Sequence, residues 1–82
     1  MITVRLFGTF SIDNDFFEFD ENDITIKNII KKIKTEHTKL DEKKLKKSVI
    51  FVNEKNITGL NRLSHKLKTG DKITFLTPAS GG

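Results

Sequence analysis

One stretch of this 82-residue chain has the apolar spacing of a helix, and it constrains the fold more than any other feature. Four isoleucines recur there at i, i+3, i+4 and i+7: Ile26, Ile29, Ile30 and Ile33. Thr25 or Asp23 can cap the start of this helix, and we expect it to end near His37. A helix with one apolar face must bury that face against another element. The rest of the chain offers short strand-like segments for this purpose.

Segments on both sides of the helix alternate between apolar and polar residues, as half-buried strands do. We expect strands at residues 1–10, 16–20, 48–53 and 72–76, and a short return strand that begins at Ile57. In the first strand Ile2, Val4 and Leu6 are expected to face the core, and in the last strand Ile73 and Phe75 share one face. A chain of this length forms one small core.

Several leucines outside these elements are expected to complete the core. Leu40 and Leu45 lie in or beside a lysine-rich stretch, residues 41–47, and are expected to cover the edge of the core. Leu60, Leu63 and Leu67 are expected to hold an irregular segment against it. The lysines off the helix stripe predict a solvated face, with an electrostatic docking surface as the alternative.

The order of these elements predicts an α+β fold. It is a mixed sheet of four to five strands with one main helix packed on one face. Because a helical crossover separates the two strand pairs, the first and last strands should lie side by side and parallel in the middle of the sheet. This is the β-grasp, or ubiquitin-like, arrangement. We expect residues 1–77 to form it and residues 78–82 to form a flexible tail that ends in Gly-Gly.

The tail is the part of the sequence that suggests chemistry. Pro78 has no N–H to donate to a sheet, so the chain should leave the sheet near this residue. Ala79 and Ser80 keep the segment thin, and Gly81 and Gly82 have no Cβ, so a narrow channel can close around their backbone. An α-carboxyl is ionised at neutral pH and is a poor electrophile. It would therefore need activation, for instance as an acyl-adenylate, by another protein.

Composition excludes several other function classes. The chain has no cysteine, hence no disulfide or thiolate metal site, and it has no apolar run near the length of a membrane span. Its net charge of +4 comes from lysines that are interspersed with acids, which argues against a nucleic-acid stripe. His37 and His65 have no nucleophile or metal ligand at motif spacing. We expect a cytoplasmic protein that is monomeric when free, binds no metal, nucleic acid or membrane, and is not itself an enzyme.

Four stretches resemble the ubiquitin-like sulfur-carrier family, which includes ThiS-like and MoaD-like proteins. They are residues 2–8 (ITVRLFG), 25–26 (TI), 52–53 (VN) and 67–82 (LKTGDKITFLTPASGG). Within this family the chain is most similar to the small subunits of molybdopterin synthase. The resemblance spans the chain and is most specific over the last sixteen residues.

The resemblance implies how such a tail is used. An E1-like adenylating enzyme, similar to MoeB and ThiF, would use ATP to activate Gly82, which then becomes a thiocarboxylate. Gly81 would thread the channel of a large, MoaE-like synthase subunit, where the sulfur passes to a pterin precursor in molybdenum cofactor biosynthesis. No cofactor is bound by the chain itself. Partner-binding residues would lie on the sheet face away from the helix and along the tail: Phe7, Phe51, Leu76, Pro78, Ala79 and Ser80.

Three alternatives stay open from the sequence. The same activated carboxylate of Gly82 could be conjugated to lysines of target proteins, because small archaeal modifiers and the eukaryotic sulfur-carrier modifier also resemble this chain. The carrier of the thiamine pathway is a second alternative, although it is usually shorter. The third is a plain binding module, for instance for RNA, whose affinity would fall steeply with salt.

Overall fold

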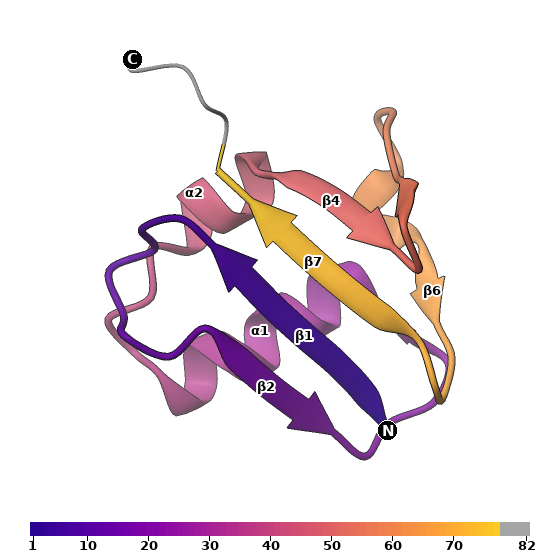
Figure 1. Cartoon of the computed structure of the whole chain (residues 1–82), viewed down its shortest axis with the longest axis horizontal. Helices are drawn as coiled ribbons and strands as arrows, with labels where there is room; N and C mark the ends of the chain where they lie inside the picture. Colours follow the sequence, from indigo (N-terminus) through magenta and orange to yellow (C-terminus); the bar gives the residue numbers. More distant parts are fainter. Residues whose placement is uncertain (78–82) are drawn as a thin grey trace.

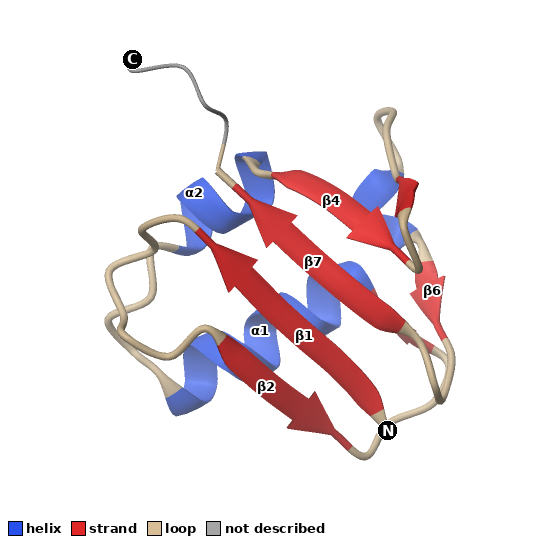
Figure 2. Cartoon of the chain, viewed as in Figure 1, coloured by secondary structure: helices blue, strands red, loops and turns tan. Residues whose placement is uncertain are grey.

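The computed structural model describes residues 1–77 and shows a five-stranded sheet covered on one face by helices (Figures 1 and 2). The strand order is β2-β1-β7-β4-β5. In that order the strands are Phe16–Phe19, Ile2–Phe7, Lys72–Leu76, Val49–Val52 and Lys55–Asn56. The main helix, α1, spans Ile26–Glu36. The expected α+β, β-grasp architecture is confirmed.

The first and last strands are neighbours at the centre of the sheet. β1 and β7 run parallel, with Phe7 opposite Leu76, and each has an antiparallel neighbour on its other side. This is the expected arrangement, and it follows from the long crossover through α1 between the two strand pairs. The C-terminal end of β7 is thereby fixed between two strands.

Helix α1 forms where the isoleucine spacing predicts it. The Thr25 hydroxyl accepts a hydrogen bond from the Asn28 N–H at 3.2 Å, so Thr25 is the N-cap. All four isoleucines of the stripe are fully buried. The helix ends at Glu36, and the His37 N–H closes the last turn on the Ile33 carbonyl at 2.8 Å.

The core lies between α1 and the inner face of the sheet, and alternate strand residues supply most of it. Each strand that packs on α1 contributes every second side chain, including Ile2, Val4, Leu6, Phe17, Phe19, Ile50, Val52, Ile73 and Phe75. The first strand is shorter than expected, because it ends at Phe7 and the chain turns at Gly8, whose φ is 126°. Phe10 therefore reaches the core from a loop and is almost completely buried.

A second helix, α2 (Glu42–Lys47), occupies the lysine-rich stretch for which no helix was predicted. Asp41 caps it by accepting a hydrogen bond from the Lys44 N–H at 3.1 Å. Leu45 is its one buried residue and Leu40, just before it, is also buried, so both leucines cover the core as expected.

Arg62 closes the C-terminal end of α2. Its guanidinium donates to the Ser48 carbonyl at 2.6 Å and also to the Lys46 carbonyl. These carbonyls have no partner within the helix, so a cation is favourable at this end. Arg62 belongs to the short 3-10 helix η1 (Arg62–Ser64), which is 14 residues further along the chain than Ser48.

Two expectations for the segment between β4 and β7 were wrong. The return strand β5 lies at Lys55–Asn56, before Ile57, because Asn53 and Glu54 alone form the turn, with φ values of 51° and 70°. Such a two-residue turn with positive φ at both positions matches the twist of a hairpin. Leu60 is fully exposed instead of packed on the core, whereas Leu67 is buried and Leu63 is partly buried.

A small second sheet ties this segment to the start of α1. β3 (Ile24–Thr25) pairs antiparallel with β6 (Lys66–Leu67). Beside it, Lys68 Nζ donates to an Asp23 carboxylate oxygen at 3.2 Å, and Lys66 Nζ lies 3.8 Å from the other oxygen. The hydrogen bond from Lys68 and the nearby lysine charges lower the pKa of Asp23. Within residues 1–77 we find no helix with the length and apolar character needed to cross a bilayer.

Candidate functional site

Thr77, the last described residue, is held at the end of the central strands. β7 ends at Leu76, and the Thr77 N–H then donates to the Phe7 carbonyl at 3.0 Å. The Thr77 hydroxyl lies 3.4 Å from the same carbonyl oxygen. Thr77 is therefore held against the end of β1, and we call Thr77 the tail root.

Gly8 allows this close approach. A Cβ at Gly8 would lie 2.1 Å from Thr77 Oγ1, and the positive φ of Gly8 is one that other residues rarely adopt. Gly8 was part of the sequence resemblance, but its contact with the tail root was not predicted. Pro78, Ala79, Ser80, Gly81 and Gly82 lie outside the described residues, so their roles and the flexibility of the tail stay predictions.

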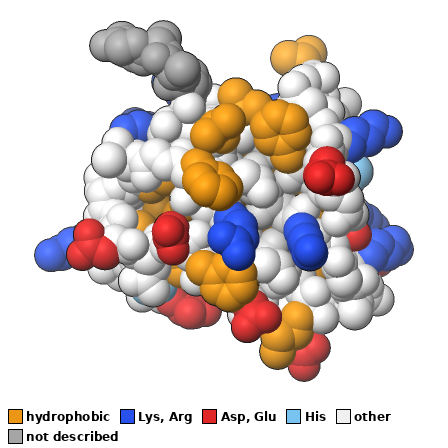
Figure 3. Space-filling model, in the orientation of Figure 1, with side chains coloured by type: hydrophobic (Ala, Val, Ile, Leu, Met, Phe, Trp, Pro, Cys, Tyr) orange, Lys and Arg blue, Asp and Glu red, His pale blue; other side chains and the backbone are white. Residues whose placement is uncertain are grey.

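Apolar side chains gather on the outer sheet face beside the tail root (Figure 3). Phe7 is 49% exposed and Leu76 is 39% exposed. These two residues are cross-strand partners, and Leu76 is also paired with Val49 on β4. Phe51, two residues along β4, is half-buried on the same face. We call these four residues the outer-face patch.

The structure thus brings together the three predicted residues Phe7, Phe51 and Leu76 and adds Val49. A half-exposed apolar cluster of this kind is typical of a surface that binds a partner. Val49 was not predicted, although alternation within the strand expected at residues 48–53 puts it on the same face as Phe51. The register adds that it lies opposite Leu76. The partner-binding role of the patch is a prediction.

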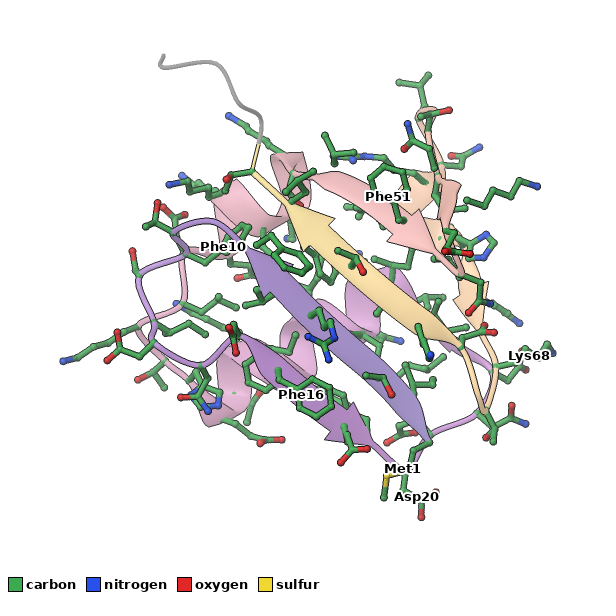
Figure 4. The ribbon with its side chains drawn as sticks, viewed as in Figure 1. Met1, Phe10, Phe16, Asp20, Phe51 and Lys68 are labelled. Atoms are coloured by element: carbon green, nitrogen blue, oxygen red, sulfur yellow. The ribbon has the colours of Figure 1, made fainter. Side chains whose placement is uncertain are left out.

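Phe16 extends this face toward the sheet edge. It is 42% exposed on β2, and the Arg5 guanidinium lies 5.1 Å from its ring centroid, a cation–π distance. Arg5 is paired with Phe16 on one side and with Thr74 on the other, and Thr74 is paired with Phe51. Figure 4 shows Phe16 over β2 and Phe51 over β4. Arg5 therefore lies between Phe16 and Phe51 in one row across the sheet, with Thr74 next to Phe51. Strand alternation in the sequence did not predict this row, because it depends on the register between strands.

The family model of the ThiS family matches residues 4–82. The chain belongs to the ThiS family. It is a sulfur-carrier protein of the ubiquitin-like type, and small carriers of this type are non-catalytic subunits.

Two solved structures are similar to this ThiS-family chain. One is a chain of the protein–protein complex of subunits 1 and 2 of the molybdopterin-converting factor from Helicobacter pylori 26695. It is 32% identical, with a TM-score of 0.60, and the match covers 99% of this chain and 97% of that one. The other is the HVO 2177 protein of Haloferax volcanii, with 18% identity, a TM-score of 0.74, and coverage of 99% and 85%. The second likeness is one of fold alone. The comparison with curated proteins gives no match.

Both histidines of this ThiS-family protein have structural contacts. The His37 ring stands edge-on to Phe17, with 5.1 Å between the ring centroids. The His65 carbonyl accepts the N–H of Ile26, the first residue of α1, at 3.0 Å. Among residues 1–77 no three histidine or carboxylate side chains are grouped so that they could hold a metal ion. The tail root and the outer-face patch are therefore the candidate site.

Proposed function

We propose that the chain carries sulfur as a thiocarboxylate on Gly82 and serves as the small subunit of a molybdopterin synthase. The observation that supports this most strongly is the 32% identity to a chain of the molybdopterin-converting factor complex, over nearly the full length of both chains. The tail sequence and the ThiS family match agree with it. The neighbour was solved with its partner subunit, which supports a large-subunit partner for this chain as well.

The proposed chemistry takes place on Gly82 and is carried out by partner enzymes. A carboxylate oxygen of Gly82 attacks the α-phosphorus of ATP on an E1-like enzyme, the C–O–P link forms, and pyrophosphate leaves. A donor then supplies sulfur at the oxidation level of sulfide to the carbonyl carbon, and AMP leaves. The first step converts an ionised, unreactive carboxylate into an electrophile.

In this proposal the folded domain holds the start of the tail in place and offers a surface to the partner. The tail root is hydrogen-bonded to the central strand β1, so the residue before Pro78 has a fixed position. From Pro78 to Gly82 the chain can extend at most roughly 14 Å, enough to enter a channel in another protein. The outer-face patch, next to the tail root, supplies an apolar surface on which the same partner can rest.

The mass of the intact protein, purified from its own cell, tests this proposal. We expect a fraction of the molecules to gain the mass of one sulfur in exchange for one oxygen, located in the C-terminal peptide. A variant without Gly81 and Gly82 should show no such fraction. If the protein instead occurs only as branches on lysines of other proteins, the conjugation alternative is correct and sulfur carriage is not its function.

The outer-face patch is tested by Leu76→Ser. We expect the affinity for the large synthase subunit to fall by about tenfold or more, because an apolar side chain near the centre of the contact is lost. The free energy of unfolding should fall by about 1–2 kcal/mol, because Leu76 is 39% exposed and the side chain that is lost is partly buried.

Leu60→Ser is the matched control for this variant. Leu60 is also exposed, but it lies in the segment between β5 and η1, outside the outer-face patch. The Leu60→Ser variant should leave the affinity for the large subunit unchanged, as measured by titration calorimetry. Equal affinities of the two variants would show that the patch does not contact the large subunit.

A further inference from the structure

Although lysines and acids are interspersed along most of the chain, most of the net charge is concentrated around α2. Residues 39–47 contain five lysines and two acids, a net charge of +3 out of +4 for the whole chain. The lysines are Lys39, Lys43, Lys44, Lys46 and Lys47. This stretch therefore differs from the rest of the chain, in which the charges nearly cancel.

Three of these lysines, Lys43, Lys44 and Lys47, are exposed on α2 and available to a partner. In the part of the chain that the structure describes, no carboxylate lies within ion-pair distance of any of them. Lys46 is different, because it pairs with Glu42 at 3.4 Å. We call Lys43, Lys44 and Lys47 the α2 basic surface.

The stability of α2 explains only some of these cations, because Lys44, Lys46 and Lys47 lie in its last turn and Lys43 does not. A helix gains from basic residues in its last turn, where they oppose the macrodipole. Lys43 and Lys47, however, are like charges at i and i+4, and Lys44 and Lys47 are like charges at i and i+3. Each such pair costs a helix about 0.2–0.5 kcal/mol. The short helix is held by Leu45 and Arg62 despite this repulsion.

The fold places the α2 basic surface beside the tail root. The residue after the C-cap of α2 is Val49, which is paired with Leu76, the residue before Thr77. On the other side of α2, Lys44 Nζ donates to Thr9 Oγ1 at 3.1 Å, and Gly8, next to Thr9, packs against Thr77. Figure 1 shows α2 next to the end of β7. A partner that receives the tail must therefore come close to these lysines.

We propose that the α2 basic surface docks on carboxylates at the rim of the opening through which the adenylating enzyme receives the tail. This inference rests on the proposed function and names the chemistry of its first partner. The tail carries a carboxylate toward bound ATP, so two anions must approach each other. Cations at the tail root offset this repulsion, and a carboxylate rim attracts them from a distance. Charge pairs at a rim raise the rate of encounter most strongly at low salt.

The double variant Lys43→Glu/Lys47→Glu tests this docking. We expect kcat/KM for ATP-dependent adenylation by the purified activating enzyme to fall about tenfold or more at low salt. The fall should come through KM, with kcat at saturation unchanged, because the tail itself is intact. The neutral variant Lys43→Gln/Lys47→Gln should fall between this variant and the unaltered chain. Because salt screens exposed charges, the differences should shrink at about 0.5 M salt.

Lys27→Glu/Lys31→Glu is the matched control. These lysines are also exposed, have the same i,i+4 spacing and give the same change in net charge, but they lie in the first half of α1. We expect less than a twofold change in kcat/KM. A thermal melt of each variant verifies that it is folded.

Two results would overturn the inference while the proposed function stands. One is normal adenylation of Lys43→Glu/Lys47→Glu. The other is an equal loss in the α1 control, which would show an effect of net charge alone. If the α2 variant loses binding to heparin but is adenylated normally, the surface binds a polyanion instead. Failure of the activating enzyme to adenylate even the unaltered chain would overturn the proposed function, and this inference with it.

Discussion

Replacing Gly8 with alanine should destabilise the folded protein by about 2–6 kcal/mol. Two effects add up. The φ of 126° costs a residue with a Cβ about 1–3 kcal/mol, and forcing an extra methyl group into a close contact costs a similar amount. The contact is severe, because the new Cβ would lie 2.1 Å from Thr77 Oγ1. Urea unfolding followed by circular dichroism measures the loss, and the m-value should stay constant.

Gly59→Ala separates these two effects. Gly59 also has a positive φ, 103°, but a Cβ there would have no neighbour within 4 Å. The Gly59→Ala variant should lose only the free energy of unfolding that the positive φ costs, so Gly8→Ala should be the more destabilising variant. Adding Thr77→Gly to Gly8→Ala removes the contact and should recover part of the loss. If Gly8→Ala and Gly59→Ala are equally stable, the close approach to the tail root does not constrain residue 8.

Leu45→Ala should have an effect of similar size. Leu45 is the one buried residue of α2 and is fully buried, so truncating it leaves a cavity and costs about 2–5 kcal/mol. For a domain of this size, such a loss lowers the melting temperature by about 10 °C or more. Amide hydrogen exchange should also show that α2 loses protection before the central strands do.

Leu60→Ala is the control with the same chemical change. Leu60 is fully exposed, and its truncation should change the free energy of unfolding by no more than about 0.5 kcal/mol. A small effect of Leu45→Ala, comparable with that of Leu60→Ala, would mean that α2 is held to the domain by its hydrogen bonds and not by its buried leucine.

Local patterns were enough to predict the main elements. The Ile26–Ile33 spacing and the cap at Thr25 determine α1 within its own sequence, and strand alternation assigns inner and outer faces. The parallel pairing of β1 and β7 followed from the rule for crossovers. Strand alternation also placed Phe7, Phe51 and Leu76 correctly on the outer face.

What was missed depends on contacts between distant residues. α2 has one apolar residue in six, so no periodicity reveals it, and part of its support comes from Arg62. The approach of Gly8 to Thr77 joins positions 69 residues apart. Leu60 was placed on the core because of its residue type, although only the path of its loop decides its exposure. The two-residue turn at Asn53 and Glu54 requires positive φ values that this pair does not signal strongly.

The central position of β7 also affects biosynthesis. β7 is synthesised after the other four strands of its sheet, yet β1 and β4 both need it as a neighbour. The nascent chain therefore cannot complete its sheet on the ribosome until Leu76 has emerged from the exit tunnel. A product that stops prematurely within β7 would lack this strand and could not join β1 to β4 in one sheet. Almost all folded molecules have therefore been translated past the central strand.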